Sequence, residues 1–202
     1  MDALDEVMDT AGPLLRRVDE LLSGLGAPPD HDVWAEMRRV RLLPGDAAHA
    51  VAALRATELE PAAPELRADA RSYAGIAEAL PAPGAWTGDA ADAYDAARRR
   101  TAEHLSGGAD TLDERLEATA DLADALVEWM GQTRGDLART LAHVLGSAEA
   151  LSLSSDAAID PAATVEVIAA AEVGRRILRT IADSYELAAD LLHGSADLAS
   201  SG

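Results

Sequence analysis

Uncharged residues recur in alternating steps of three and four through the long central stretch of this 202-residue chain. The series reads Leu105, Ala109, Leu112, Leu116, Thr119, Ala123, Leu126, Met130, Thr133, Leu137, Thr140 and Val144. This spacing places all of them along one face of an α-helix and is typical of a helix that packs against a partner helix. We therefore predict a helix from about residue 89 to about 150, with bends at Gly107-Gly108 and between Gly131 and Gly135.

A line of uncharged residues with this spacing is called a seam below. Three other parts of the chain contain similar seams, and together the four seams define the predicted fold. The first covers residues 2–25, the second 46–80 and the last 161–198, and a short helix is expected near 32–41. Short turns between long helices favour antiparallel neighbours. We predict a single all-α domain over 1–202, an elongated four-helix bundle with a helical hairpin at 46–150 and flanking N- and C-terminal helices.

Proline and glycine residues set the expected helix ends, and they leave two alternatives open. Pro13 either kinks the first helix or marks its start. Pro61 and Pro64 interrupt the second seam, so 46–80 is either one kinked helix or two; its regular spacing favours a near-continuous helix bent near Pro61. The stretch 80–84 ends this segment, and Asp89 is expected to cap the helix that follows.

Amino-acid composition indicates what the core is made of and argues against one class of partner. Apolar residues make up 49% and aromatic residues 3%, with no Phe, so the core must consist of Leu, Ala and Val. The net charge is −19 and every cation is Arg, a bias that looks like a high-GC coding genome. An acidic chain without a basic face argues against a nucleic-acid partner.

The expected location follows from what the chain lacks. It contains no Cys, no classical signal peptide and no long uninterrupted apolar stretch. We therefore expect a cytoplasmic protein without a membrane span, and any export must use a route that reads no classical signal peptide.

The sequence offers no catalytic, cofactor-binding or metal-binding constellation. The nearest matches to a di-iron Glu-x-x-His motif are Asp46-x-x-His49 and Asp190-x-x-His193, which carry Asp in place of Glu and lack accompanying central glutamates. No Gly-x-Ser-x-Gly elbow and no phosphate-binding glycine loop is found. We therefore predict that the chain is not an enzyme and has no cofactor.

One motif in the predicted hairpin turn carries a family resemblance. Trp86-Thr87-Gly88 is followed by Ala90, Ala91 and Tyr94, in the pattern Trp-x-Gly then Ala-Ala-x-Ala-Tyr. The stretch resembles the WXG100 family of type VII (ESX) secretion, and the longer EspB-like and PPE-like proteins that place Trp-x-Gly inside larger helical bundles. The resemblance covers about half the chain, roughly 46–145. It implies that the Trp86 ring plugs the end of a helical hairpin while Gly88 permits close passage of the backbone.

The resemblance implies a helical interaction protein that serves type VII secretion as substrate, partner or chaperone. The alternative is a cytoplasmic structural or adaptor bundle with no secretion role. The Tyr-x-x-x-Asp/Glu secretion signal expected beside such hairpins is missing, since Ala77, Arg98 and Ala189 stand four residues after the three tyrosines. The partner would be a second copy or a WXG-like protein, and the oligomeric state stays open.

The surface predicted to pack against such a partner is the seam of the N-terminal helix, which Pro28-Pro29 sets apart from the rest of the chain. Its residues are Leu4, Val7, Leu14, Val18 and Leu21.

Overall fold

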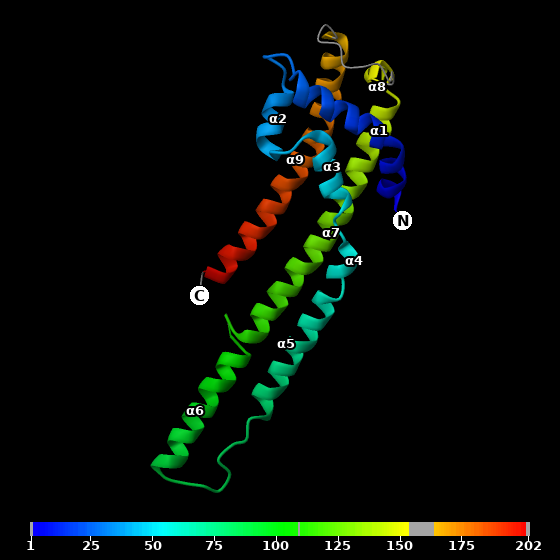
Figure 1. The fold of residues 1–202 in the computed structure, drawn as a ribbon. Helices are drawn as coiled ribbons and strands as arrows, with labels where there is room; N and C mark the ends of the chain where they lie inside the picture. The colour runs from blue at the N-terminus through cyan, green and yellow to red at the C-terminus, as the bar shows by residue number, and fades with distance from the viewer. Residues whose placement is uncertain (1, 109, 154–163, 201–202) are drawn as a thin grey trace. The chain divides into compact units, whose positions relative to one another are not determined.

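The computed structural model describes residues 2–108, 110–153 and 164–200, and over these residues the chain is all-α with no strand (Figure 1). The all-α prediction is therefore confirmed, whereas the finer prediction of a four-helix bundle is not. Tertiary contacts divide the chain into two compact units, where the sequence predicted one domain. The first unit comprises 1–55 and 129–188, and the second comprises 56–128 and 189–202.

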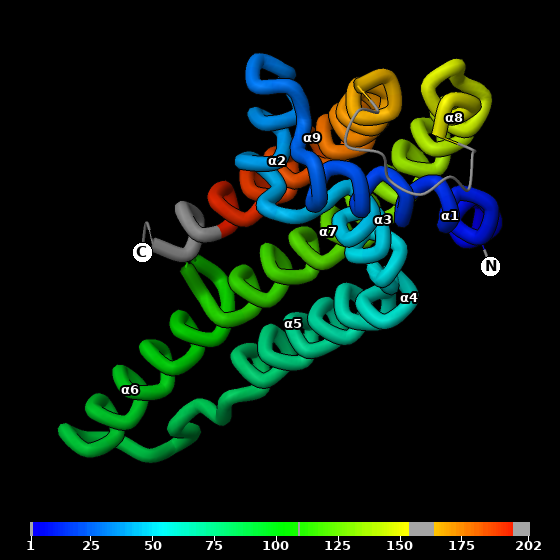
Figure 2. The backbone as a smooth tube through the Cα atoms, turned by 45° about the horizontal axis from the view of Figure 1, so that its top comes forward, coloured from blue at the N-terminus to red at the C-terminus, as the bar shows by residue number. Residues whose placement is uncertain are grey.

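The helices have the following bounds (Figure 2). They are α1 (Ala3–Gly24), α2 (Val33–Val40), α3 (Pro44–Ala52), α4 (Ala56–Leu59), α5 (Ala62–Ala79), α6 (Asp89–Leu105), α7 (Leu112–Leu145), α8 (Ala148–Leu153) and α9 (Thr164–Ser200).

Helix α1 begins and ends where its local signals predict. The Asp2 carboxylate accepts the backbone N–H groups of Leu4 and Asp5. The Asp5 carboxylate in turn accepts the backbone N–H of Asp2, and the two sets of bonds form a capping box. Pro13 lies inside the helix at an exposed position, so it does not mark the helix start. Just beyond the helix, Gly26 adopts a φ of 74°, a conformation that favours glycine.

The first unit contains the well-filled core. Every large side chain that is fully buried among the described residues belongs to it: Leu4, Leu15, Val18, Leu21, Val33, Val51, Leu137, Leu141, Val144, Ile177, Leu178 and Ile181. Burial of this kind contributes roughly 1.5–3 kcal/mol per side chain. The core is thus made of Leu, Ala, Val and Ile supplied by α1, α2, α3, α7, α8 and α9.

The predicted interaction seam of α1 is part of this core. Leu4, Val18 and Leu21 are fully buried, and Val7 and Leu14 pack half-buried against the same cluster. The expectation that this helix packs against a partner chain is therefore wrong. Its apolar face is buried within its own unit, because α1 contacts α3 and α8 and shares one apolar cluster with residues of α2, α7 and α9.

The two long helices predicted in the middle of the chain are each divided. Instead of one bent helix over 46–80, the chain forms α3, α4 and α5, and Pro61 is the N-cap residue of α5. Instead of one helix over 89–150, it forms α6, α7 and α8. The break between α6 and α7 contains Gly107 with a φ of 101° and Asp110 with a φ of 68°, so the Gly107-Gly108 prediction is confirmed as an interruption.

The remaining predicted boundaries have mixed outcomes. Gly131 and Gly135 lie inside the unbroken helix α7. Helix α8 ends at Leu153, and the predicted start of the last helix at 161 lies outside the described residues. Helix α9 runs to Ser200, close to the expected end at 198.

Candidate interaction surface

The Trp86 turn joins two antiparallel helices of the second unit, α5 and α6 (Figures 1 and 2). Helix α5 ends at Ala79, and the Trp86 N–H donates to the Pro83 carbonyl at 3.2 Å across a turn in which Gly84 has a φ of 61°. Gly88 has a φ of 95° and is the N-cap residue of α6; its carbonyl accepts the N–H groups of Ala91 and Asp92. The motif therefore forms a hairpin turn, as the sequence predicted.

The helix that follows is capped differently from the prediction. Gly88 makes no side-chain cap, and Asp89 is the first helical residue rather than the capping residue. Its carboxylate, together with that of Asp92, lies in the first turn of α6, where negative charge interacts favourably with the helix dipole. Asp89 therefore has an electrostatic role at the start of α6, in place of the capping role that the sequence predicted.

The Trp86 ring does not plug the hairpin end. Trp86 is 52% exposed and Tyr94 is 37% exposed, and their ring centroids are 5.9 Å apart. The Tyr94 hydroxyl donates to the Pro81 carbonyl at 2.9 Å, which ties the first part of α6 to the segment directly after α5. The prediction of a buried plug is therefore wrong, since about half of the Trp86 surface stays accessible to solvent. The two rings instead form an ordered aromatic pair at the surface.

Of the remaining motif residues, Ala91 faces the interior and Ala90 faces solvent. Ala91 is 3% exposed, whereas Ala90 is exposed. This difference follows from helical geometry, since adjacent residues point about 100° apart around the axis. The Ala-Ala pair therefore contributes one small side chain to the contact between α5 and α6.

The second unit buries only small side chains. Among its described residues, the buried ones are Ala63, Ala70, Ala77, Ala91, Thr111, Ala120 and Ala123. Its large apolar side chains remain partly or mostly accessible, including Ile76 at 47% and Leu192 at 51%. Alanine burial removes little apolar area from water, so this unit has unused capacity to bury surface against another chain.

Electrostatics hold α5 against the second-unit part of α7. The Arg67 guanidinium donates to Asp124 at 2.7 Å and to Asp121 at 2.6 Å, and its Nε lies 3.5 Å from Glu117. These bonds to carboxylates raise the pKa of Arg67. Glu117, Asp121 and Asp124 of α7 therefore serve contacts within the unit.

A buried arginine in the first unit was also missed. The Arg134 side chain of α7 is 10% exposed, binds the carboxylates of Asp2 and Asp5 at 2.6–2.8 Å, and donates to the carbonyls of Ala52 and Leu54. These bonds lower the pKa of Asp2 to about 2, with the Arg134 hydrogen bond as the largest cause. Arg134 thereby joins the start of α1 to the end of α3. No local pattern predicts a bond across 82 residues.

The first-unit parts of α7 and α9 meet through hydroxyl groups beside a groove of about 400 Å³. Thr133 bonds to Ser184, and Thr140 bonds to Thr180 at 3.0 Å. The Trp129 indole N–H donates to the Ser184 carbonyl at 2.8 Å. The uncharged seam predicted the position of both threonines, but only the fold identifies their partners on α9.

The described residues give no sign of metal or membrane chemistry. Over 2–108, 110–153 and 164–200, no group of three or more His, Asp or Glu side chains could hold a metal ion. Within the same ranges, no helix is long and apolar enough to cross a membrane.

Comparisons with known proteins add no relative. No protein-family model matches the sequence, and comparison with curated proteins and with solved structures gives no significant match.

Proposed function

We propose that this chain is a non-enzymatic helical interaction protein of the WXG100-like kind, which serves type VII secretion as substrate, partner or chaperone. The observation that carries the proposal is the Trp86-x-Gly88 turn between α5 and α6, with the Trp86 and Tyr94 rings ordered at the surface of the hairpin. Exposed aromatic side chains are enriched where proteins bind one another, since each can bury 150–250 Å².

The weakly filled interior of the second unit supports the same proposal. A hairpin whose buried side chains are alanine and threonine gains little from its own packing, so a partner that covers Ile76, Trp86 and Tyr94 would add substantial apolar burial. The partner we propose is a second Trp-x-Gly helical hairpin or another helical component of the secretion machinery. It would pack its apolar face along α5 and α6.

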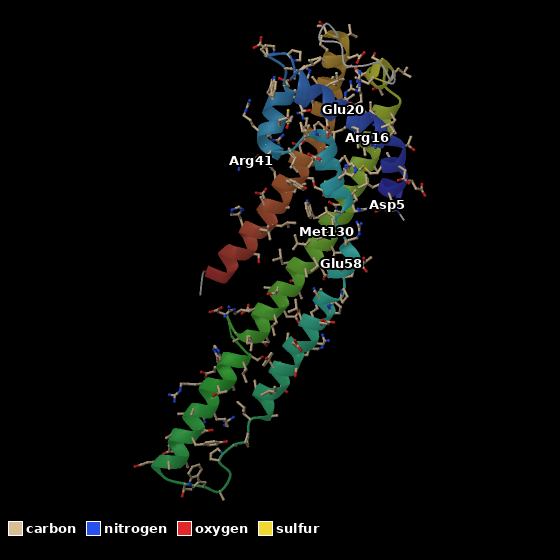
Figure 3. The ribbon with its side chains drawn as sticks, in the orientation of Figure 1. Asp5, Arg16, Glu20, Arg41, Glu58 and Met130 are labelled. Atoms are coloured by element: carbon tan, nitrogen blue, oxygen red, sulfur yellow. The ribbon has the colours of Figure 1, made fainter. Side chains whose placement is uncertain are left out.

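Cross-linking from the turn tests this proposal in the full chain. A photo-reactive amino acid placed at position 86 should capture a Trp-x-Gly protein or a type VII component, identified by mass spectrometry. The same group at Arg16, an exposed position of α1 in the first unit, is the matched control and should capture neither (Figure 3). Capture of neither class from position 86, or equal capture from both positions, would overturn the proposal.

Export distinguishes the secretion role from the alternative of a cytoplasmic adaptor bundle. The alternative is favoured by the missing signal, because Ala77, Arg98 and Ala189 occupy the positions where Asp or Glu would stand after each tyrosine. If the chain is a substrate, deletion of the secretion machinery abolishes its appearance in the culture medium. If it is a partner or chaperone, it stays in the cell and co-purifies with a machinery component. Retention without any such component supports the adaptor role.

A further inference from the structure

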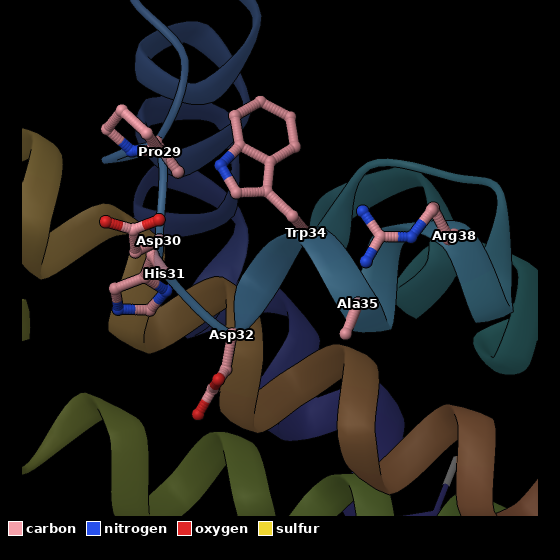
Figure 4. A pocket seen from close by; sticks show the side chains of 8 residues that line it. Pro29, Asp30, His31, Asp32, Trp34, Ala35 and Arg38 are labelled. Carbon is pink, nitrogen blue, oxygen red and sulfur yellow. The ribbon is translucent and has the colours of Figure 1, made fainter.

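A hollow of about 520 Å³ lies beside the start of α2 in the first unit, and His31 stands at its edge (Figure 4). The turn that precedes α2 is well ordered by hydrogen bonds. The Pro28 carbonyl accepts both the His31 N–H at 3.0 Å and the Trp34 indole N–H at 2.9 Å. The His31 imidazole is therefore held by its own backbone at the N-terminus of the helix.

The His31 ring caps α2 in place of the usual side chain. Asp32 is the N-cap residue but makes no side-chain capping bond. Instead, the Val33 N–H donates to His31 Nδ1 at 3.1 Å. An imidazole nitrogen accepts a hydrogen bond only through its lone pair, so Nδ1 carries no proton in this arrangement and the ring proton sits on Nε2.

His49 shows the opposite geometry and provides an internal comparison. Its Nδ1 lies 2.8 Å from the Gly45 carbonyl oxygen, so that nitrogen must carry a proton and donate. Protonation of the second ring nitrogen leaves the His49 bond intact. Protonation of His31 at Nδ1, by contrast, removes the lone pair that accepts the Val33 N–H.

The other nitrogen of His31 faces a carboxylate on α9. His31 Nε2 lies 4.0 Å from Glu172 Oε2, too far for a hydrogen bond, and this oxygen already accepts the Arg175 Nε–H at 2.9 Å. Bonds from Arg175 and Arg176 lower the pKa of Glu172 to about 2, with Arg175 as the largest cause, so this carboxylate remains ionised when histidines titrate.

We propose that His31 is a proton-sensitive switch at the start of α2, which caps the helix when neutral and releases the Val33 N–H when charged. The titratable and charged groups around it come from its own turn, from α2 and from α9. They are Asp30, Asp32, Glu36, Arg38, Glu172, Arg175 and Arg176. Protonation of His31 at Nδ1 therefore frees the Val33 N–H.

Nuclear magnetic resonance of the full chain tests the switch directly. At pH 7.5, long-range ¹H–¹⁵N spectra should show His31 protonated on Nε2 alone and His49 protonated on Nδ1; at pH 5.5 both nitrogens of His31 should carry protons. The amide of Val33 should lose protection against hydrogen exchange by roughly five-fold between these pH values, after correction for intrinsic rates, as expected for the loss of one cap. The amide of Ala53, at the end of α3, should show no such change.

Substitution of His31 distinguishes the proposed switch from other effects of low pH on the protein. In His31→Asn the side-chain oxygen can accept the Val33 N–H at any pH, so the protection of Val33 should become independent of pH. The same loss of protection in His31→Asn as in the wild type would overturn the proposal. So would a proton on Nδ1 of His31 at pH 7.5, a result that requires only the wild-type chain.

Discussion

At Gly174 of α9, replacement by alanine adds a single methyl group. This substitution should show whether the cost of overpacking the core outweighs the gain in helix propensity. A Cβ atom there would lie 2.9 Å from Pro44 Cγ, 3.1 Å from Leu22 Cδ1 and 3.5 Å from Val33 Cγ2. Favourable carbon–carbon contacts require about 3.5–4.0 Å. The proline ring cannot rotate away and Leu22 is 5% exposed, so neither neighbour can easily retreat.

The expected magnitude follows from two opposing effects. Replacing glycine with alanine inside a helix stabilises it by about 0.5–1 kcal/mol, whereas overpacking a filled core costs about 1–3 kcal/mol. For Gly174→Ala we expect a net loss of about 1–2 kcal/mol in the free energy of unfolding. Gly131→Ala is the matched control, because Gly131 is exposed within α7 and has nothing within 4 Å of its Cβ position. That variant should gain about 0.5–1 kcal/mol.

Urea denaturation followed by tryptophan fluorescence measures this difference. Two of the three tryptophans, Trp34 and Trp129, belong to the first unit, so a Trp86→Phe background restricts the signal to that unit. The two glycine variants should lie on opposite sides of the parent, separated by about 2–3 kcal/mol, with unchanged m-values. If Gly174→Ala is as stable as Gly131→Ala, α9 does not pass Pro44 and Leu22 as closely as described.

Two further predictions concern the turn and the chain start. Trp86→Ala should cost about 1 kcal/mol or less rather than the 3–5 kcal/mol typical of a buried aromatic ring, because the ring is 52% exposed; a melting curve showing a loss above 3 kcal/mol would mean that the ring is buried in solution. The pKa of Asp2 is lowered to about 2, so its bond to Arg134 stabilises the fold above pH 4 and is lost as the pH falls toward 2. Asp2→Asn keeps a capping side chain but loses the charge. Its urea midpoint should lie below that of the wild type at pH 6 and meet it at pH 2, and an equal difference at both pH values would contradict the assignment.

The features that the sequence predicted well depend on near neighbours in the chain. The extent of α1, the run of uncharged residues in α7 and the turn at Trp86-Thr87-Gly88 all follow from residues within a few positions of one another. Helical periodicity, capping and glycine turns act over this same distance. The existence and type of these elements were therefore accessible without a fold.

The features that the sequence did not predict depend on residues far apart in the chain. Helix α3 ends at Ala52, where guanidinium groups of Arg55 and Arg134 bind the carbonyls of Ala52 and Leu54 that a continuing helix would use. The regular seam over 46–80 favoured continuation. Only the arrival of α7 brings Arg134 to this point, and the helix is interrupted there.

The candidate site likewise has some features that the sequence predicted and others that it did not. The sequence located the turn and named Trp86, Gly88 and Tyr94, but it assigned the Trp86 ring to the interior. Whether a ring is buried depends on the size of the side chains that surround it, and in the second unit the buried ones are alanine and threonine. Arg134 gave no local signal, because its role depends on the distant residue Asp2. His31 accepts the N–H of Val33, only two residues away, but histidine is not among the usual capping residues.

By itself the sequence determined that the chain is helical and where most of its apolar faces lie. The tertiary structure decided which of those faces are buried. The seam of α1 fills the core of the first unit, while α5 and α6 leave Ile76, Trp86 and Tyr94 at the surface. The physical reason is that a three-and-four spacing marks the side of a helix that gains from burial without specifying the surface that covers it. That surface is set by the volumes and charges of residues brought together from distant parts of the chain.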